Sequence, residues 1–156
     1  MPDFAVLSLL GAVAGLIASA VMNGFQAVAA GPFGQTSTDD PATVKFADLL
    51  SKALTGQPVT QKRRALAGQV VHYTTGLVLG VIYALVATQW PTVTLWFGVA
   101  YGLVVAVVLD YVVVPALGIG PPAWKTPLAA HAYGLISHAI FGAALQAVRE
   151  LGFLLF

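Results

Sequence analysis

The stretch GQVVHYTTGLVLG, residues 68–80, sets one histidine among glycines inside a long apolar run without charges. A second stretch, GLISHAIFGAALQ at residues 134–146, has the same pattern, Gly-x-x-x-His-x-x-x-Gly-x-x-Leu. Residues four apart lie on one face of an α-helix, and small residues there allow transmembrane helices to pack closely. The two stretches therefore predict two membrane-spanning helices, each with a packing stripe that carries His72 or His138.

The composition of the whole chain is that of a membrane protein. Of its 156 residues, 58% are hydrophobic and only 8% are charged, against about 25% charged in soluble domains. The first apolar run starts with Asp3 and no Lys or Arg, which favours a span over a signal peptide. We predict an all-α integral membrane protein whose residues 1–156 form a single four-helix domain. Four runs reach the roughly 20 apolar residues that a spanning helix needs: residues 4–30, 65–88, 93–117 and 127–148.

Several classes of function are disfavoured by what the sequence lacks. It has no cysteine, which excludes disulfides and thiolate metal sites, and its net charge of +1 provides no basic face for nucleic acid. It contains no Walker loop, zinc-protease motif or Gly-x-Ser-x-Gly elbow. We therefore expect no hydrolase or nucleotide enzyme. The expected partners are membrane lipid and other membrane-protein subunits or further copies of the chain.

The loop at residues 31–64 contains the signals of a further helix over residues 41–55. Asp40 is a suitable N-cap, Pro41 suits the first helical position and Gly56 suits the end. Such an amphipathic helix is typical of a membrane surface, and packing on the loop's own residues is the alternative. One face is apolar and the other is charged: Phe46, Leu49, Leu50, Ala53 and Leu54 against Lys45, Asp48 and Lys52.

The distribution of basic residues predicts the orientation of the chain. Six of the seven Lys and Arg residues lie in the loops at residues 31–64 and 118–127. Cytoplasmic loops of membrane proteins carry an excess of Lys and Arg. We therefore expect a multi-pass protein with these two loops in the cytoplasm and both termini outside.

Every predicted span has a stripe of small residues at a spacing of four, and each stripe carries the most polar side chain of its span. We expect the stripes to be helix-packing seams. Their glycines are Gly11, Gly15, Gly68, Gly76, Gly80, Gly98, Gly102, Gly134 and Gly142.

The order of the motifs indicates an internal duplication. Residues 11–23 and 98–110 both begin Gly-x-x-x-Gly-Leu and end in Asn23 or Asp110, just as the two histidine stretches match each other. Spans one and two then correspond to spans three and four. Two tandem helical hairpins in the same orientation predict a pseudo-twofold axis along the membrane normal.

Polar side chains recur at a similar depth in the four spans. They lie about 10–16 Å below the surface that carries the long loops: Asn23, His72, Asp110 and His138. His131 is on the same face as His138 but nearer that surface, and Pro115 is expected to kink the third span beside Asp110. We expect Asn23, His72, Asp110, His131 and His138 to form an intramembrane polar site. An ionisable side chain within a span is a functional candidate. The alternative is an Asp–His hydrogen bond that only sets the helix register.

Three segments between residues 68 and 150 resemble a known family. They are HYTTGLVLGVIYALVATQWPTVTLWFGVAYGLVVA from residue 72, PALGIGPPAW from residue 115 and SHAIFGAALQAVRE from residue 137. In these motifs the chain is similar to the YagU-like family of small bacterial inner-membrane proteins. The resemblance implies a multi-pass protein of the bacterial inner membrane, with a loose link to acid tolerance and no mechanism.

Three classes of function fit these features. The small size and the small-residue stripes favour an accessory or structural subunit of a larger membrane complex, or a homo-oligomer. Alternatively, protons or a small solute cross at the polar site, because histidine titrates near neutral pH. A third hypothesis is a b-type haem held between His72 and His138, or an iron bound by these histidines and Asp110.

Overall fold

Helices make up nearly all of the chain that the structure, a computed structural model, describes: residues 3–34 and 39–155. The predicted all-α class and the four candidate spans are confirmed, although the last helix continues to Leu155 rather than ending at residue 148. The stretches long and apolar enough to cross a membrane are Phe4–Ala29, Gln61–Gln89, Val99–Ala116 and Leu128–Gly152. The elements in chain order are α1 (Phe4–Ala29), α2 (Ala42–Thr55), η1 (Gln61–Arg63), α3 (Arg64–Gln89), η2 (Pro91–Thr94), α4 (Val99–Ala106), η3 (Val107–Val113), α5 (Val114–Ala116), η4 (Ala123–Lys125) and α6 (Leu128–Leu155).

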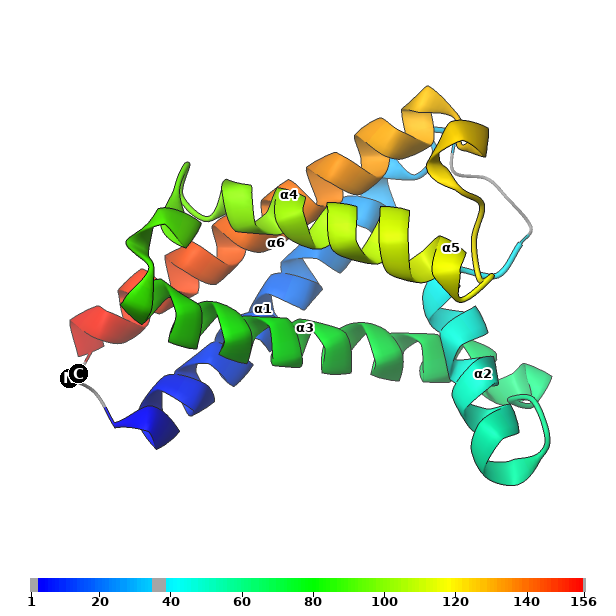
Figure 1. The fold of residues 1–156 in the computed structure, drawn as a ribbon, viewed down its shortest axis with the longest axis horizontal. Helices are drawn as coiled ribbons and strands as arrows, with labels where there is room; N and C mark the ends of the chain where they lie inside the picture. The colour runs from blue at the N-terminus through cyan, green and yellow to red at the C-terminus, as the bar shows by residue number, and fades with distance from the viewer. Residues whose placement is uncertain (1–2, 35–38, 156) are drawn as a thin grey trace.

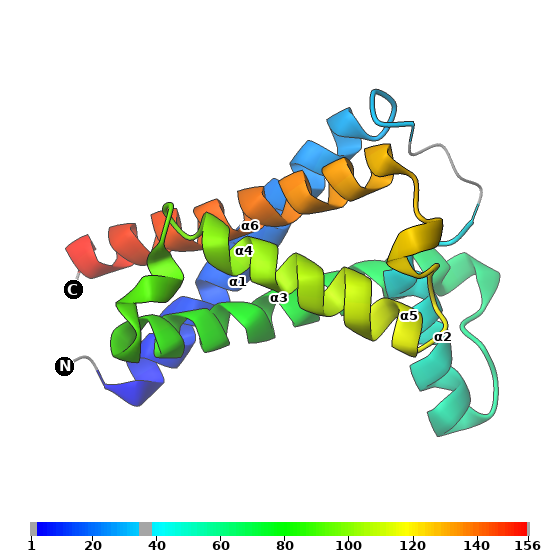
Figure 2. The same ribbon diagram turned by 45° about the horizontal axis from the view of Figure 1, so that its top comes forward.

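The long helix α1 packs against both α3 and α6, while α4 packs against α6. Figure 1 shows the start of α1 and the end of α6 at one end of the molecule, and α2 beside the start of α3 at the other. The same arrangement is visible from a second direction in Figure 2. Small, aliphatic and aromatic side chains fill the core between the helices: Ala14, Ala18, Met22, Tyr83, Phe141 and Leu145.

The glycine stripes lie at the closest contacts between helices. A Cβ atom on Gly15 of α1 would collide with the backbone of Gly76 on α3. In the second hairpin, a Cβ on Gly142 of α6 would lie 2.9 Å from the backbone nitrogen of Gly102 on α4. Backbone atoms occupy the space that a side chain would take, so only glycine permits this approach. Gly11 and Gly80 meet in the contact of α1 with α3, and Gly98 meets Gly142 at the start of α4.

The third span begins later than predicted. The sequence indicated a start at residue 93, but α4 begins at Val99. The helix is preceded by three consecutive residues with positive φ: Trp96 (53°), Phe97 (56°) and Gly98 (79°). Left-handed residues cannot continue a right-handed helix. Residues 93–98 therefore lie in η2 and the turn after it, near which the exposed rings of Trp90 and Trp96 suit a membrane interface.

The helix that carries Asp110 widens around it. Val107–Val113 is a π-helical segment, and the N–H of Val114 donates to the carbonyl of Leu109, five residues back. Pro115 follows directly. It has no N–H and its ring crowds the carbonyl four residues earlier, which favours the wider turn. Pro115 was expected to kink the helix beside Asp110. The structure has a π-helical segment there instead.

Helix α2 forms over the predicted residues, but its N-terminus differs from the prediction. Pro41 takes the N-cap position, and the Asp40 carboxylate instead accepts a hydrogen bond from Arg64 at 2.6 Å. Arg64 also lies 2.8 Å from Asp48, so one guanidinium joins both carboxylates to the start of α3. Gly56 ends the helix in the left-handed conformation, as predicted.

Helix α2 carries both buried and exposed apolar side chains. One face packs against α3, where Val44 and Ala47 are buried and Val44 meets Gly68. The helix therefore packs on α3, and it also bonds to the loop's own residues, since Ser51 donates to the Gln57 carbonyl and Asp48 accepts from the N–H of Val59. Leu49, Leu50 and Leu54 are left exposed by the described chain, and Leu54 is 84% exposed.

Candidate functional site

The central pair of the candidate site joins η3 to α6. The Asp110 carboxylate lies 3.5 Å from Nδ1 of His138, and the same nitrogen lies 3.0 Å from the carbonyl oxygen of Gly134. Because a carbonyl can only accept, Nδ1 carries the hydrogen. A Cβ on Gly134 would lie 3.3 Å from Asp110, so this glycine leaves room for the carboxylate. His138 is nearly buried, whereas the Asp110 side chain is 39% exposed.

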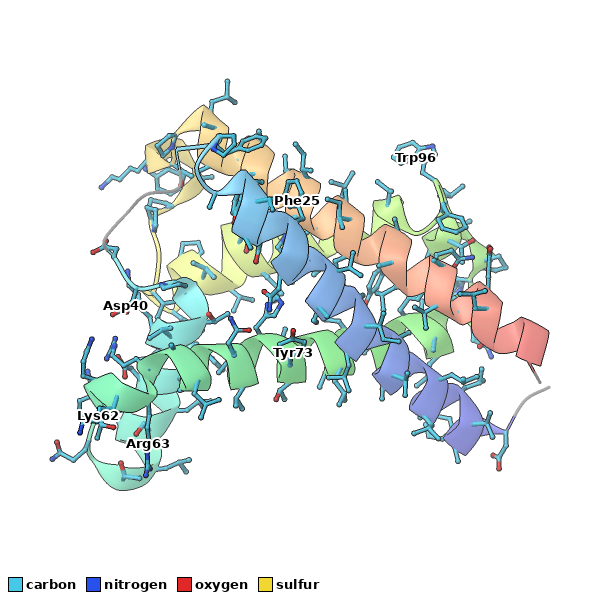
Figure 3. All side chains as sticks on the ribbon, turned by 180° about the vertical axis from the view of Figure 1, so that it is seen from behind. Phe25, Asp40, Lys62, Arg63, Tyr73 and Trp96 are labelled. Carbon is cyan, nitrogen blue, oxygen red and sulfur yellow. The ribbon has the colours of Figure 1, made fainter. Side chains whose placement is uncertain are left out.

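A second polar cluster joins α1 to α3. Nε2 of His72 donates to the carbonyl oxygen of Ser19 at 3.3 Å. Asn23 donates to Oε1 of Gln69 at 2.9 Å and to the hydroxyl of Tyr73 at 3.4 Å. Tyr73, labelled on α3 in Figure 3, packs edge-on against the His72 ring. Sequence analysis missed Gln69 and Tyr73, although their spacing of four puts them on one face of the helix.

The structure brings His72, Asp110 and His138 together only in part. Asp110 and His138 touch, but in the described parts of the chain no hydrogen bond or ion pair joins His72 to either of them. The close approach of α1 to α3 explains this, because it brings a backbone acceptor on α1 within reach of His72.

His131 belongs to a separate contact near the start of α6. Its Nδ1 lies 2.8 Å from the Tyr111 hydroxyl, and its Nε2 lies 3.1 Å from the carbonyl oxygen of Ala123. Nε2 therefore carries a hydrogen, because a carbonyl oxygen can only accept, and Nδ1 shares a hydrogen bond with the Tyr111 hydroxyl. His131 ties η4 to η3 and does not join the Asp110–His138 pair.

The residues present do not fit the haem and iron hypotheses. Across residues 3–34 and 39–155, no three His, Asp or Glu side chains come together in a group that could hold a metal ion. The glycines beside the histidines leave no room for a macrocycle, because Gly76 lies against Ser19 and Gly142 lies against Gly102.

A further polar network lies in the other half of the bundle. The buried Tyr83 hydroxyl donates to Oε1 of Gln146 at 2.5 Å, and Nε2 of Gln146 donates to Glu150 at 2.8 Å. The ring of Tyr101 lies 4.8 Å from that of Tyr83, measured between centres. Gln146 and Glu150 were not predicted from the sequence. Their spacing of four on α6 was the available signal.

A family model matches most of the chain. Residues 41–147 match the family described as "Protein of unknown function (DUF1440)". The chain belongs to the DUF1440 family. The matched region runs from α2 into α6, so it includes the Asp110–His138 pair and the contacts between α2 and α3. No curated protein and no solved structure matches the chain. Membership of DUF1440 leaves the narrower YagU-like resemblance as a prediction.

Proposed function

We propose that this DUF1440 protein binds protons at the Asp110–His138 pair and conducts them across the membrane that its helices span. The observation that carries the proposal is a carboxylate and an imidazole 3.5 Å apart within candidate spans. Charged side chains are costly within a membrane, so those that occur there mark ion or proton pathways. An imidazole beside the carboxylate can accept a proton on one ring nitrogen and donate one from the other.

The surroundings of Asp110 support proton exchange at this pair. Its side chain is 39% exposed, although its partner His138 is nearly buried. The carboxylate is therefore accessible from the surface of the bundle, while the imidazole lies inside it. The π-helical segment around Asp110 supports the same role, because widened turns of this kind recur at functional sites.

Polar side chains continue in the other half of the bundle. Tyr83 and Gln146 are buried, and Glu150, at the end of their hydrogen-bonded network, is exposed. The hydrogen bonds of such a buried network strengthen one another, because their members polarise each other. The network supports a route for protons through the half of the membrane opposite to Asp110.

The hypothesis of an accessory subunit loses its main sequence argument. That argument relied on small-residue stripes as seams for a partner helix. The stripes are used within the chain, where Gly15 meets Gly76 and Gly102 meets Gly142. We therefore favour proton conduction. If the following test shows no proton conduction, a passive subunit is favoured instead.

Liposomes that contain the purified protein and a pH-sensitive dye test the proposal. With K⁺ and valinomycin present to balance charge, an external acid step should acidify the interior faster than in empty liposomes. Asp110→Asn should reduce this rate to that of empty liposomes, because an amide cannot bind the proton. Asp39→Asn is the control, since Asp39 is exposed and outside the spans, and it should leave the rate unchanged. An Asp110→Asn variant as fast as the native protein would refute the proposal.

The contacts of the glycines also support duplication of a helical hairpin. Gly15 and Gly76 meet in the first hairpin, and the positions aligned with them, Gly102 and Gly142, meet in the second. The two halves differ at their polar residue, since α1 is a regular helix where η3 is widened. We retain the pseudo-twofold repeat as a proposal on this basis.

The position of α2 at a membrane surface is a further part of the proposal. We place it on the cytoplasmic face of a bacterial inner membrane, because its leucines are exposed and most basic residues of the chain lie in its loop. Spin labels at Leu50 and Lys52 test this position. The label at Leu50 should meet oxygen dissolved in lipid, and the label at Lys52 should meet a water-soluble nickel complex. Equal accessibility of the two labels would contradict it.

A further inference from the structure

We infer that α2, η1 and the start of α3 form a binding surface for anionic lipid headgroups, with Lys62 and Arg63 as its principal contacts. The inference goes beyond proton conduction and rests on the proposed position of α2 at the membrane surface. The property by which this surface selects a lipid is the negative charge of the headgroup.

The three cations of the run Lys62-Arg63-Arg64 differ in their exposure and in their ion pairs. Arg64 is 18% exposed and binds both Asp40 and Asp48. Lys62 and Arg63 are exposed, and no acidic side chain of the described residues forms an ion pair with either. One cation of the run thus holds the local fold together, while the other two remain available for an external anion.

The position of these two cations suits a lipid headgroup. Lys62 and Arg63 lie in η1, directly before the apolar part of α3. Figure 3 shows both at the end of the molecule that carries α2, and Trp96 toward the opposite end. Residues 39–64 carry five basic and three acidic side chains, a net charge of +2. This end of the protein therefore attracts the anionic leaflet of a membrane.

The exposed leucines of α2 provide a second, independent observation. Leu49, Leu50 and Leu54 form an uncovered apolar face. Lys45 and Lys52 are four and three residues from Leu49, so they lie along one edge of that face. An apolar face with cations at its edge binds anionic membranes through both buried area and charge. The two Arg64 ion pairs hold α2 on α3, which keeps this face and the free cations in one arrangement.

Native mass spectrometry of the full-length protein tests the inference. The protein in neutral detergent is offered equal amounts of phosphatidylglycerol and phosphatidylcholine, and the bound lipids are counted. We expect phosphatidylglycerol to be retained preferentially. Lys62→Gln and Arg63→Gln should each weaken that preference about fivefold, the factor expected for one basic side chain at an anionic surface.

Lys125→Gln is the matched control, because Lys125 lies in η4 on the other loop of the same side. It should leave the preference unchanged. An equal loss in Lys125→Gln, or equal retention of the two lipids by the native protein, would overturn the inference. If the label at Leu50 is in lipid while the two lipids are retained equally, this inference alone fails. If that label is in water, the interfacial position of α2 fails with it.

Discussion

Replacing Gly15 with alanine should destabilise the protein by about 1–3 kcal/mol, the usual cost of overpacking a close contact. The added Cβ would collide with the backbone of Gly76, and backbone atoms cannot rotate away as a side chain can. Helices α1 and α3 would have to separate, and the core between them would lose contacts. Unfolding of the purified protein in mixed micelles with increasing sodium dodecyl sulfate measures the change in the free energy of unfolding.

Gly24→Ala is the matched control, because Gly24 lies on the same helix. No neighbouring heavy atom lies within 4 Å of a Cβ placed there. Alanine has the higher helix propensity, so Gly24→Ala should leave the stability unchanged or raise it. Gly102→Ala tests the corresponding contact in the second hairpin and should also destabilise. If Gly15→Ala were as stable as Gly24→Ala, the proposed close contact of α1 with α3 would be wrong.

The variants Asp110→Asn and His138→Phe should be strongly non-additive. His138→Phe leaves a carboxylate in the span without its imidazole, and Asp110→Asn leaves the imidazole without its anion. The double variant removes both members, so it should recover part of the stability lost in the single variants. We expect a coupling free energy of about 0.5–3 kcal/mol from the same unfolding measurement. Because Asp110 is partly exposed, a value in the lower half of that range is expected.

A second cycle distinguishes the Asp110–His138 pair from a general effect of removing histidines. It combines Asp110→Asn with His72→Phe. His72 donates to Ser19 and makes no hydrogen bond or ion pair with Asp110 among the residues described. This cycle should be additive within about 0.5 kcal/mol. Equal coupling in both cycles would place His72 in direct contact with the pair and contradict the observed arrangement.

The start of α2 shows where local sequence signals were insufficient. Asp40 before Pro41 is a favourable capping pattern, and the helix indeed forms there. Arg64, far along the chain, competes for the same carboxylate with a charge-assisted hydrogen bond. The start of the third span is similar, because apolarity indicated a helix at residue 93. Apolarity carries no information about the left-handed backbone of Trp96 and Phe97.

The sequence by itself determined the all-helical class, the four candidate spans and the glycine faces on which the helices meet. Apolar length and a spacing of four are properties of short segments, so they can be read before any contact is known. The sequence alone also predicted that the polar residues form an intramembrane site. Only the tertiary structure decided that Asp110 meets His138 while His72 bonds to Ser19. The acceptor that an imidazole reaches depends on the rotation and closeness of two helices, and these follow from all their contacts together.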